Sequence, residues 1–396
     1  MVGTMSFLLF GDQSLNTHAF LAEFYRLGAP SILAKTFLEQ AGQALREEID
    51  GLGKLDRAQL PIFRTLQQLN ERYHAQSRKH SGVDSALLCV AQLAHYIDRA
   101  EKGPQDVVVH EDTYILGLCT GLFAAAAVAS TGSVSTLIPL AVQTVLMAFR
   151  TGSHVASLAE RLCPATDRSD PWTHVLVDVT EADVNKALRS FHSSHSVPPP
   201  SQAYISAVST HRLAVSGPPT TLKALVESNL LGAQSTTIPV YGPYHSAHLH
   251  SGVDIDKLLG LDDVNITRLL EQTRPRSAVM SGARGTWIAS LDTKDLIRAV
   301  TRECLTELLQ FHKGLELCVE TAQAFDGTSC LVIPFGPTTN AESLSSLIRQ
   351  KTKLTMKPNR LPVRPPLPLG GANANYPKPT APSRRGNLLS FSHKLR

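Results

Sequence analysis

The sequence predicts an α/β fold in which a small β-α-β-β-α-β unit is inserted into a larger α/β part. Hydrophobic residues make up 43% of the 396 residues and charged residues 18%, so the chain can bury a sizeable core. Short apolar runs alternate with longer segments that repeat apolar residues every three or four positions, as strands and helices do. The small unit is predicted because its six elements follow one another in that order over residues 173–240.

The first part of the chain predicts strands that alternate with helices. Residues 6–10 (SFLLF) form a short apolar run that the turn Gly11-Asp12-Gln13 ends, which predicts a buried strand, and residues 113–116 predict a second one. Apolar spacing and alanine content predict helices over 31–50, 56–74, 82–100, 122–129 and 136–163. Residues 113–149 carry no charge, but the polar run from Ser130 to Thr136 divides them. Two buried helices joined by a turn are therefore expected rather than a membrane span.

The middle of the chain has the pattern of a ferredoxin-like unit. Thr180, followed by Glu181 and Asp183, is typical of a helix start. The predicted order is strand 173–179, a helix from 180 to about 192, strands 203–209 and 212–216, a helix over 218–229 and strand 236–240. Residues 1–172 and 241–355 then form the larger part, into which residues 173–240 are inserted as a subdomain.

The last residues differ in composition from the rest. Residues 356–396 contain eight prolines and eight lysines or arginines without any acidic residue, which predicts a linker tail. With these eight charges removed, the net charge of +4 becomes −4, so the body is mildly acidic and nucleic acid is not an expected partner. Six cysteines without a CxxC pair and an N-terminus without a signal-peptide pattern predict a reducing, cytoplasmic location.

The segment Gly117-Leu118-Cys119-Thr120-Gly121 carries the first candidate chemistry. It lies between a predicted strand and a predicted helix, where a tight turn exposes a nucleophile and the helix N-terminus favours a thiolate. The alternative is a buried cysteine in a turn that glycine permits. A backbone N–H at Gln13, after the first strand, is a candidate oxyanion donor together with the N–H of Thr120.

A thiol nucleophile needs a base, and a cluster of three histidines follows the inserted unit. His245, His248 and His250 come after the loop Tyr241-Gly-Pro-Tyr244. An imidazole there can take the Cys119 proton. A metal site and simple surface histidines are the alternatives, although the order matches no common zinc pattern.

Three motifs together resemble one family. LFGDQ at 9–13, GLCTG at 117–121 and GPYHSAHL at 242–249 resemble the starter unit:acyl-carrier-protein transacylase (SAT) domain of fungal non-reducing polyketide synthases. The resemblance covers roughly residues 6–350. It implies a malonyl-transacylase-like acyltransferase fold, with a large α/β-hydrolase-like subdomain and an inserted ferredoxin-like one.

The resemblance also implies the roles of individual residues. Cys119 stands where the nucleophile stands, His245 where the histidine base stands, and Gln13 where the oxyanion-loop glutamine stands. His248 and His250 are then bystanders. Arg150 matches only loosely an arginine that clamps the malonyl carboxylate in extender-loading relatives, so it is no evidence for a malonyl substrate.

The implied reaction is acyl transfer in two steps. A starter acyl group arrives as a thioester of coenzyme A or of an upstream carrier protein, passes through acyl-Cys119, and goes to the phosphopantetheine thiol of the acyl carrier protein. No bound cofactor or metal and no membrane are expected, and a ketosynthase domain would follow the tail. An α/β-hydrolase-type thioesterase and a non-catalytic docking domain for the carrier protein are the alternatives.

Overall fold

The computed structural model describes residues 3–26, 30–103, 109–163, 169–232, 234–288, 290 and 292–358. All of these belong to one compact unit. Of the tail predicted over 356–396, only residues 356–358 fall within the described part, so the linker prediction lies outside it. The division of the chain at residues 173 and 240 stays a prediction.

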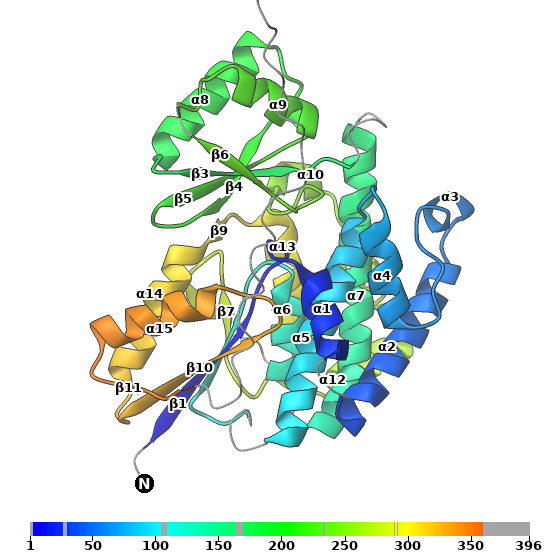
Figure 1. Cartoon of the computed structure of the whole chain (residues 1–396), viewed down its shortest axis with the longest axis vertical. Coiled ribbons are helices and arrows are strands. Elements are labelled where there is room, and N and C mark those ends of the chain that lie inside the picture. Colours follow the sequence, from blue (N-terminus) through cyan, green and yellow to red (C-terminus); the bar gives the residue numbers. More distant parts are fainter. Residues whose placement is uncertain are drawn as a thin grey trace, which may run out of the picture. The chain divides into compact units, whose positions relative to one another are not determined.

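The larger of two sheets runs in the order β11-β10-β1-β2-β7-β8 (Figure 1). Its strands are β1 (Thr4–Phe10), β2 (Thr113–Gly117), β7 (Val279–Ser281), β8 (Thr286–Ile288), β10 (Ser329–Phe335) and β11 (Thr355–Met356). Neighbouring strands are parallel except β7 and β8 at one edge. Phe10 lies opposite Gly117, so the turns that follow β1 and β2 meet at the carboxyl edge of the sheet.

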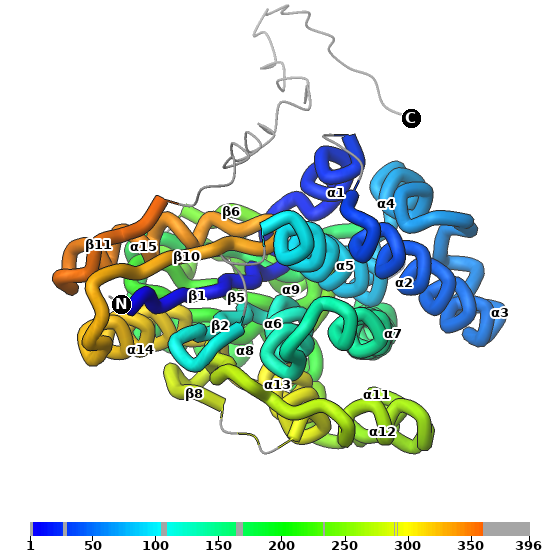
Figure 2. Tube along the Cα trace, turned by 90° about the horizontal axis from the view of Figure 1, so that it is seen from below, coloured from blue at the N-terminus to red at the C-terminus, as the bar shows by residue number. Residues whose placement is uncertain are grey.

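Helices cover both faces of this sheet, which explains why β1 is apolar from Phe7 to Phe10. Leu8 and Phe10 pack on one face with α5 (Ser81–Lys102), α6 (Gly121–Ala129) and α7 (Val134–Leu162). Phe7 and Leu9 pack on the other face with α14 (Phe311–Ala324) and α15 (Asn340–Lys351). Successive strand side chains point to opposite faces, so a strand buried on both faces has no polar alternation. Figures 1 and 2 show α14 and α15 on one side of β1 and helices α5–α7 on the other.

The helices of the larger part come before and after the small unit. Those before it are α1 (Thr17–Arg26), α2 (Ile32–Asp50), α3 (Lys54–Arg57), α4 (Leu66–Ala75), α5 (Ser81–Lys102), α6 (Gly121–Ala129) and α7 (Val134–Leu162). Those after it are α10 (Ala247–His250), α11 (Ile255–Leu259), α12 (Val264–Glu271), α13 (Thr293–Thr306), α14 (Phe311–Ala324) and α15 (Asn340–Lys351). Helix α7 is long and apolar enough to cross a membrane, but 67% of its most apolar window is buried, as expected for a core helix.

The smaller sheet has the order β6-β3-β5-β4-β9, and its first four strands give the ferredoxin-like topology. Its elements are β3 (Thr173–Val177), α8 (Glu181–Ser194), β4 (Tyr204–Val208), β5 (Arg212–Ser216), α9 (Pro219–Glu227), β6 (Ser235–Ile238) and β9 (Leu309–Gln310). Helices α8 and α9 pack on one face of this sheet (Figure 1). The predicted fold class is confirmed, but β9 joins β4 in parallel from outside the predicted 173–240 segment.

Two helices and one boundary residue differ from the prediction. The helix expected over 56–74 is two helices, α3 and α4, because Pro61 interrupts it and Thr65 caps the second one. Helix α1 was not predicted. Met356, the first residue assigned to the tail, pairs with Cys330 in the sheet.

Candidate active site

Cys119 lies on a sharp turn between β2 and α6. Its φ of 49° is in the left-handed region, which is strained for a residue with a side chain. A Cβ on Gly117 would lie 2.6 Å from the Leu122 Cα, and one on Gly121 would lie 2.2 Å from the Gly11 carbonyl oxygen. Both glycines are therefore needed for the close approach of this turn to the end of β1 and the start of α6.

The Cys119 side chain is packed against apolar side chains at the N-terminus of α6. It is 6% exposed and packs with Val155, Tyr244 and Leu305. Cys304, on the last turn of α13, is fully buried and donates its S–H to the Cys119 carbonyl oxygen at 3.0 Å. The positive end of α6 and this second thiol both favour negative charge at Cys119.

His245 is brought to the thiol by the loop that follows β6. Its Nε2 lies 3.1 Å from the Cys119 Sγ, and its Nδ1 lies 2.8 Å from the carbonyl oxygen of Glu307. Because that carbonyl can only accept, Nδ1 carries a proton and Nε2 faces the sulfur. His245 also has a positive φ, of 55°, and its backbone N–H donates to the Cys304 carbonyl at 3.0 Å.

The thiol and the imidazole shift each other's proton affinity. The Cys304 thiol and then the His245 imidazole stabilise the thiolate against the cost of burial, and they lower the pKa of Cys119 to about 6. Burial alone would lower the pKa of His245, but the adjacent Cys119 and the Glu307 carbonyl raise it to about 9. Both shifts favour a thiolate next to an imidazolium.

The turn that carries His245 is fixed by hydrogen bonds from several elements. The Pro243 carbonyl accepts from His250 Nε2 at 2.7 Å and from Ser246 Oγ at 3.0 Å. Tyr204, on β4 of the small sheet, donates its hydroxyl to the Tyr244 carbonyl at 2.8 Å. Pre-organisation of this kind is needed when a residue is held at a positive φ.

The other two histidines of the cluster do not reach the thiol. His248 packs its ring edge-on against Tyr204, with ring centroids 5.3 Å apart. His250 is 3% exposed, and its Nδ1 lies 3.1 Å from His154 Nε2, so it is part of the support of the turn and not a surface bystander. Burial lowers the pKa of His250 to about 4. No group of three potential metal ligands occurs within the described residues.

The predicted oxyanion residues lie beside the nucleophile. Thr120 Oγ1 donates to Gln13 Oε1, which ties the turn after β1 to the turn after β2. Among the described residues, neither the Gln13 N–H nor the Thr120 N–H has a hydrogen-bond acceptor. Two unpaired backbone donors near a nucleophile are the arrangement that an oxyanion requires.

Arg150 is committed to an internal role. Its Nε and Nη2 bind the two carboxylate oxygens of Glu48, each at 2.7 Å, and its Nη1 donates to the Leu259 carbonyl at 2.8 Å. The guanidinium therefore links α7 to α2 and to the end of α11. The two guanidinium nitrogens that bind a carboxylate side by side already bind Glu48, so they are not available to a substrate carboxylate.

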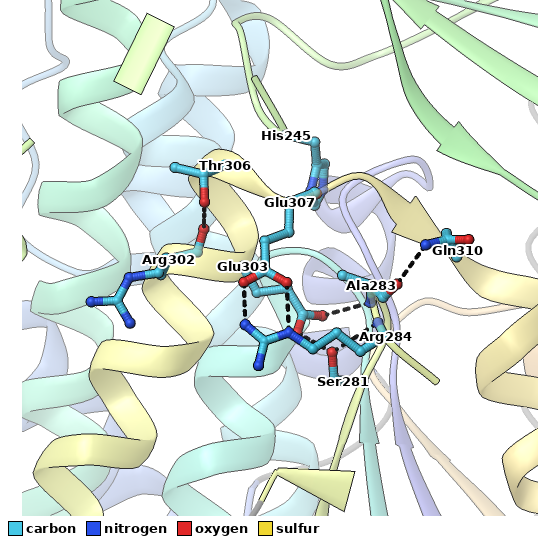
Figure 3. A network of polar contacts seen from close by, with 9 residues as sticks. All are labelled: His245, Ser281, Ala283, Arg284, Arg302, Glu303, Thr306, Glu307 and Gln310. Atoms are coloured by element: carbon cyan, nitrogen blue, oxygen red, sulfur yellow. Dashed lines mark hydrogen bonds and ion pairs between the residues drawn. The ribbon is translucent and has the colours of Figure 1, made fainter. Parts of the chain in front are cut away.

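Three residues at this site were not found from the sequence. Glu307 acts through a backbone carbonyl, which leaves no trace in residue identity. Cys304 and Tyr204 are distant in the chain and carry no motif. Figure 3 shows His245 beside Glu307, with the carboxylates of Glu303 and Glu307 around the turn from Ser281 to Arg284.

Sequence comparison identifies relatives over most of the chain. Residues 8–245 match the family model described as "Starter unit:ACP transacylase in aflatoxin biosynthesis". The conidial pigment polyketide synthase PfmaE of Pestalotiopsis fici is 54% identical over 354 residues, which are 89% of this chain and 16% of that synthase. The chain thus spans about a sixth of the length of the curated relatives it matches.

Structure comparison identifies the same fold in acyltransferases. The malonyl CoA-acyl carrier protein transacylase of Burkholderia pseudomallei has a TM-score of 0.58 at 12% identity, with 88% of this chain and 99% of that chain covered. A type II polyketide synthase acyl carrier protein in complex with its malonyl-transacylase gives 0.54 at 14% identity, covering 89% and 96%. The predicted acyltransferase fold is thereby confirmed.

Proposed function

The chain belongs to the starter unit:ACP transacylase family, a family of acyltransferases, and we propose that it loads a starter acyl group onto a carrier protein through acyl-Cys119. The observation that carries this proposal is the 3.1 Å contact between Cys119 Sγ and His245 Nε2 at the N-terminus of α6. In the proposed context the chain is the loading domain of a fungal non-reducing polyketide synthase, followed by a ketosynthase.

In the first half-reaction the Cys119 thiolate attacks the carbonyl carbon of an acyl thioester. The backbone N–H groups of Gln13 and Thr120 donate to the oxyanion of the tetrahedral intermediate. When the intermediate collapses, the bond to the donor sulfur breaks, and His245 Nε2 gives its proton to the leaving thiolate. The products are acyl-Cys119, a neutral imidazole and a free thiol of coenzyme A or of an upstream carrier protein.

In the second half-reaction the imidazole acts as the base. His245 Nε2 takes the proton of the phosphopantetheine thiol, and the resulting thiolate attacks the acyl-Cys119 carbonyl. Cys119 leaves as a thiolate, and the imidazolium that pairs with it is restored. One thioester replaces another of similar energy, so the transfer is reversible and consumes no cofactor. Pantetheine belongs to the partners.

The surroundings of Cys119 suit an uncharged acyl group. Val155, Tyr244 and Leu305 line the thiol, and Arg150 has its guanidinium committed to Glu48. A carboxylate on the acyl chain would lie against these apolar side chains without the guanidinium of Arg150 to pair with, which costs free energy. We therefore propose an acetyl or longer unsubstituted acyl starter rather than malonyl.

Intact-mass analysis after incubation with acyl thioesters tests the proposal. The wild-type protein is expected to gain the mass of one acyl group, and Cys119→Ala to gain none while retaining its fold. Cys330→Ala is the matched control, since that cysteine is also buried but lies far along the chain in β10. An acyl adduct on Cys119→Ala would refute the proposed nucleophile.

A second measurement separates transfer from hydrolysis. After acylation, holo-acyl carrier protein is added, and the acyl group on the carrier is compared with the free acid. Transfer is expected to exceed release to water by a wide margin. Dominant release would favour a thioesterase, and the absence of any adduct would favour a non-catalytic docking domain.

A further inference from the structure

Glu303 is a buried carboxylate with hydrogen bonds but without an ion-pair partner among the described residues. Glu303 as a whole residue is 3% exposed to solvent. One oxygen accepts from Ser281 Oγ at 2.5 Å and the other from the Ala283 N–H at 3.1 Å. It lies in the last turn of α13, where the helix dipole disfavours a negative charge. A buried charge in this position needs a compensating one.

The same helical turn holds His245. The Cys304 carbonyl, one residue after Glu303, accepts from the His245 N–H at 3.0 Å, and the Glu307 carbonyl, one turn later, accepts from Nδ1 at 2.8 Å. Figure 3 shows the imidazole beside this turn and Glu303 below it. Two positive groups therefore act on Glu303, the His245 imidazolium and the Arg284 guanidinium, and the guanidinium is already bound by Glu307.

We propose that Glu303 is a positioning residue whose buried carboxylate stabilises the protonated imidazole of His245 and so maintains its pairing with the Cys119 thiolate. The action is electrostatic and passes through His245, because Glu303 contacts neither the thiol nor the acyl group. The two groups also support each other's ionisation. Burial raises the pKa of Glu303, and the positive charge of His245 acts in the opposite direction.

Other charged or titratable groups face the pair from each neighbouring element. They are Asp12 after β1, Tyr204 on β4, Tyr244 and His250 around the histidine loop, Arg284 after β7, and Cys304 and Glu307 at the end of α13. Of the two glutamates, Glu307 has its carboxylate bound to the exposed guanidinium of Arg284. The charge of Glu307 is therefore neutralised at the surface, whereas Glu303 is buried and has no ion pair of its own among the described residues.

The test removes the charge of Glu303 but keeps its shape. In Glu303→Gln the side-chain oxygen still accepts from Ala283, and the amide can donate to Ser281 Oγ. Histidine ring resonances are titrated by NMR in protein labelled at histidine, and the His245 signal is assigned by its absence in His245→Gln. The pKa of His245 is expected to fall by about one unit. This readout does not depend on acyl transfer, so it tests the inference even if the proposed function is wrong.

Glu307→Gln is the matched control. It removes a charge of equal size from the same turn and leaves the carbonyl that binds Nδ1 in place, so the titration of His245 is expected to remain unchanged. Glu303→Asp retains the charge, so the pKa of His245 in this variant is expected to stay close to the wild-type value. In the acylation assay, the alkaline limb of the pH–rate profile is expected to shift to lower pH in Glu303→Gln. It is expected to stay in place in Glu307→Gln.

Two results would overturn the inference. One is a His245 pKa in Glu303→Gln that equals the wild-type value. The other is an equal shift in Glu303→Gln and Glu307→Gln, which would indicate a loosened turn rather than a lost charge. Thermal unfolding of each variant shows whether it is folded under the conditions of the titration.

Discussion

Replacing Cys304 by alanine is expected to make the Cys119 thiol harder to ionise. Cys304 is fully buried, and its Sγ lies 3.0 Å from the Cys119 carbonyl oxygen, to which it donates its S–H. The interaction of the two thiols is the first cause that lowers the pKa of Cys119 to about 6, ahead of the His245 imidazole. The substitution leaves the imidazole and the elbow glycines in place.

The expected magnitude follows from the strength of one such bond. A hydrogen bond to a charged group contributes about 1.5–3 kcal/mol, which corresponds to a rise in pKa of about one to two units. A thiol with a depressed pKa is ionised above that pKa and loses its charge as the pH falls through it. Near pH 6 the ionised fraction of Cys119 is expected to fall from about one half to between about one tenth and one hundredth. Near pH 9 the variant and the wild type should differ little.

Alkylation by iodoacetamide measures this fraction, because the thiolate reacts and the thiol does not. Peptide mass mapping follows the Cys119 adduct over time from about pH 5 to pH 9. The Cys304→Ala variant should react roughly five- to fiftyfold more slowly near pH 6. Cys304→Ser, which retains a donor, should resemble the wild type. The same pH midpoint in Cys304→Ala and in the wild type would refute the assignment.

Three further outcomes are expected. A chain ending at Pro358 should keep its melting temperature, whereas one ending at Leu354 loses β11 and should melt lower; equal melting temperatures would contradict the role of that strand. Arg150→Ala should cost about 1–3 kcal/mol in urea unfolding by leaving its glutamate unpaired, with no change in the ratio of acetyl to malonyl loading. His250→Ala should slow acylation about tenfold by loosening the turn, which corresponds to one lost hydrogen bond. His248→Ala should have almost no effect, and a loss as large as that of His250→Ala would count against this distinction.

The parts of the site that the sequence predicted are those with a local pattern. Gly117 and Gly121 indicate the turn in the sequence, because any side chain at these positions would collide with α6 or with the end of β1. The strand, turn and helix around Cys119 are neighbours in the chain, so apolar runs and spacing suffice. The prediction of His245 also required the GPYHSAHL motif at 242–249, since 125 other residues separate this histidine from Cys119.

The parts that the sequence did not predict depend on contacts between distant residues. Six buried cysteines look alike in the sequence, and only the fold places Cys304 against the nucleophile. The contact from Glu307 is made by its backbone carbonyl, which every residue type has, so the residue type gives no sign of it. Helix α1 did have a signal, since Leu21 and Phe24 are three apart and Asn16 caps the first turn. Pro61 indicates that the helix predicted over 56–74 is divided in two, but a prediction from apolar spacing alone overlooks this proline.

Strand β9 has a mechanical consequence for the site. It begins two residues after Glu307 and pairs with β4, the strand that carries Tyr204. Both of these residues bind the histidine loop, one through the imidazole and the other through the Tyr244 carbonyl. A rotation of the small sheet would therefore displace two supports of His245 at once. The position of the small sheet thus helps to set the alignment of the imidazole with the Cys119 thiol.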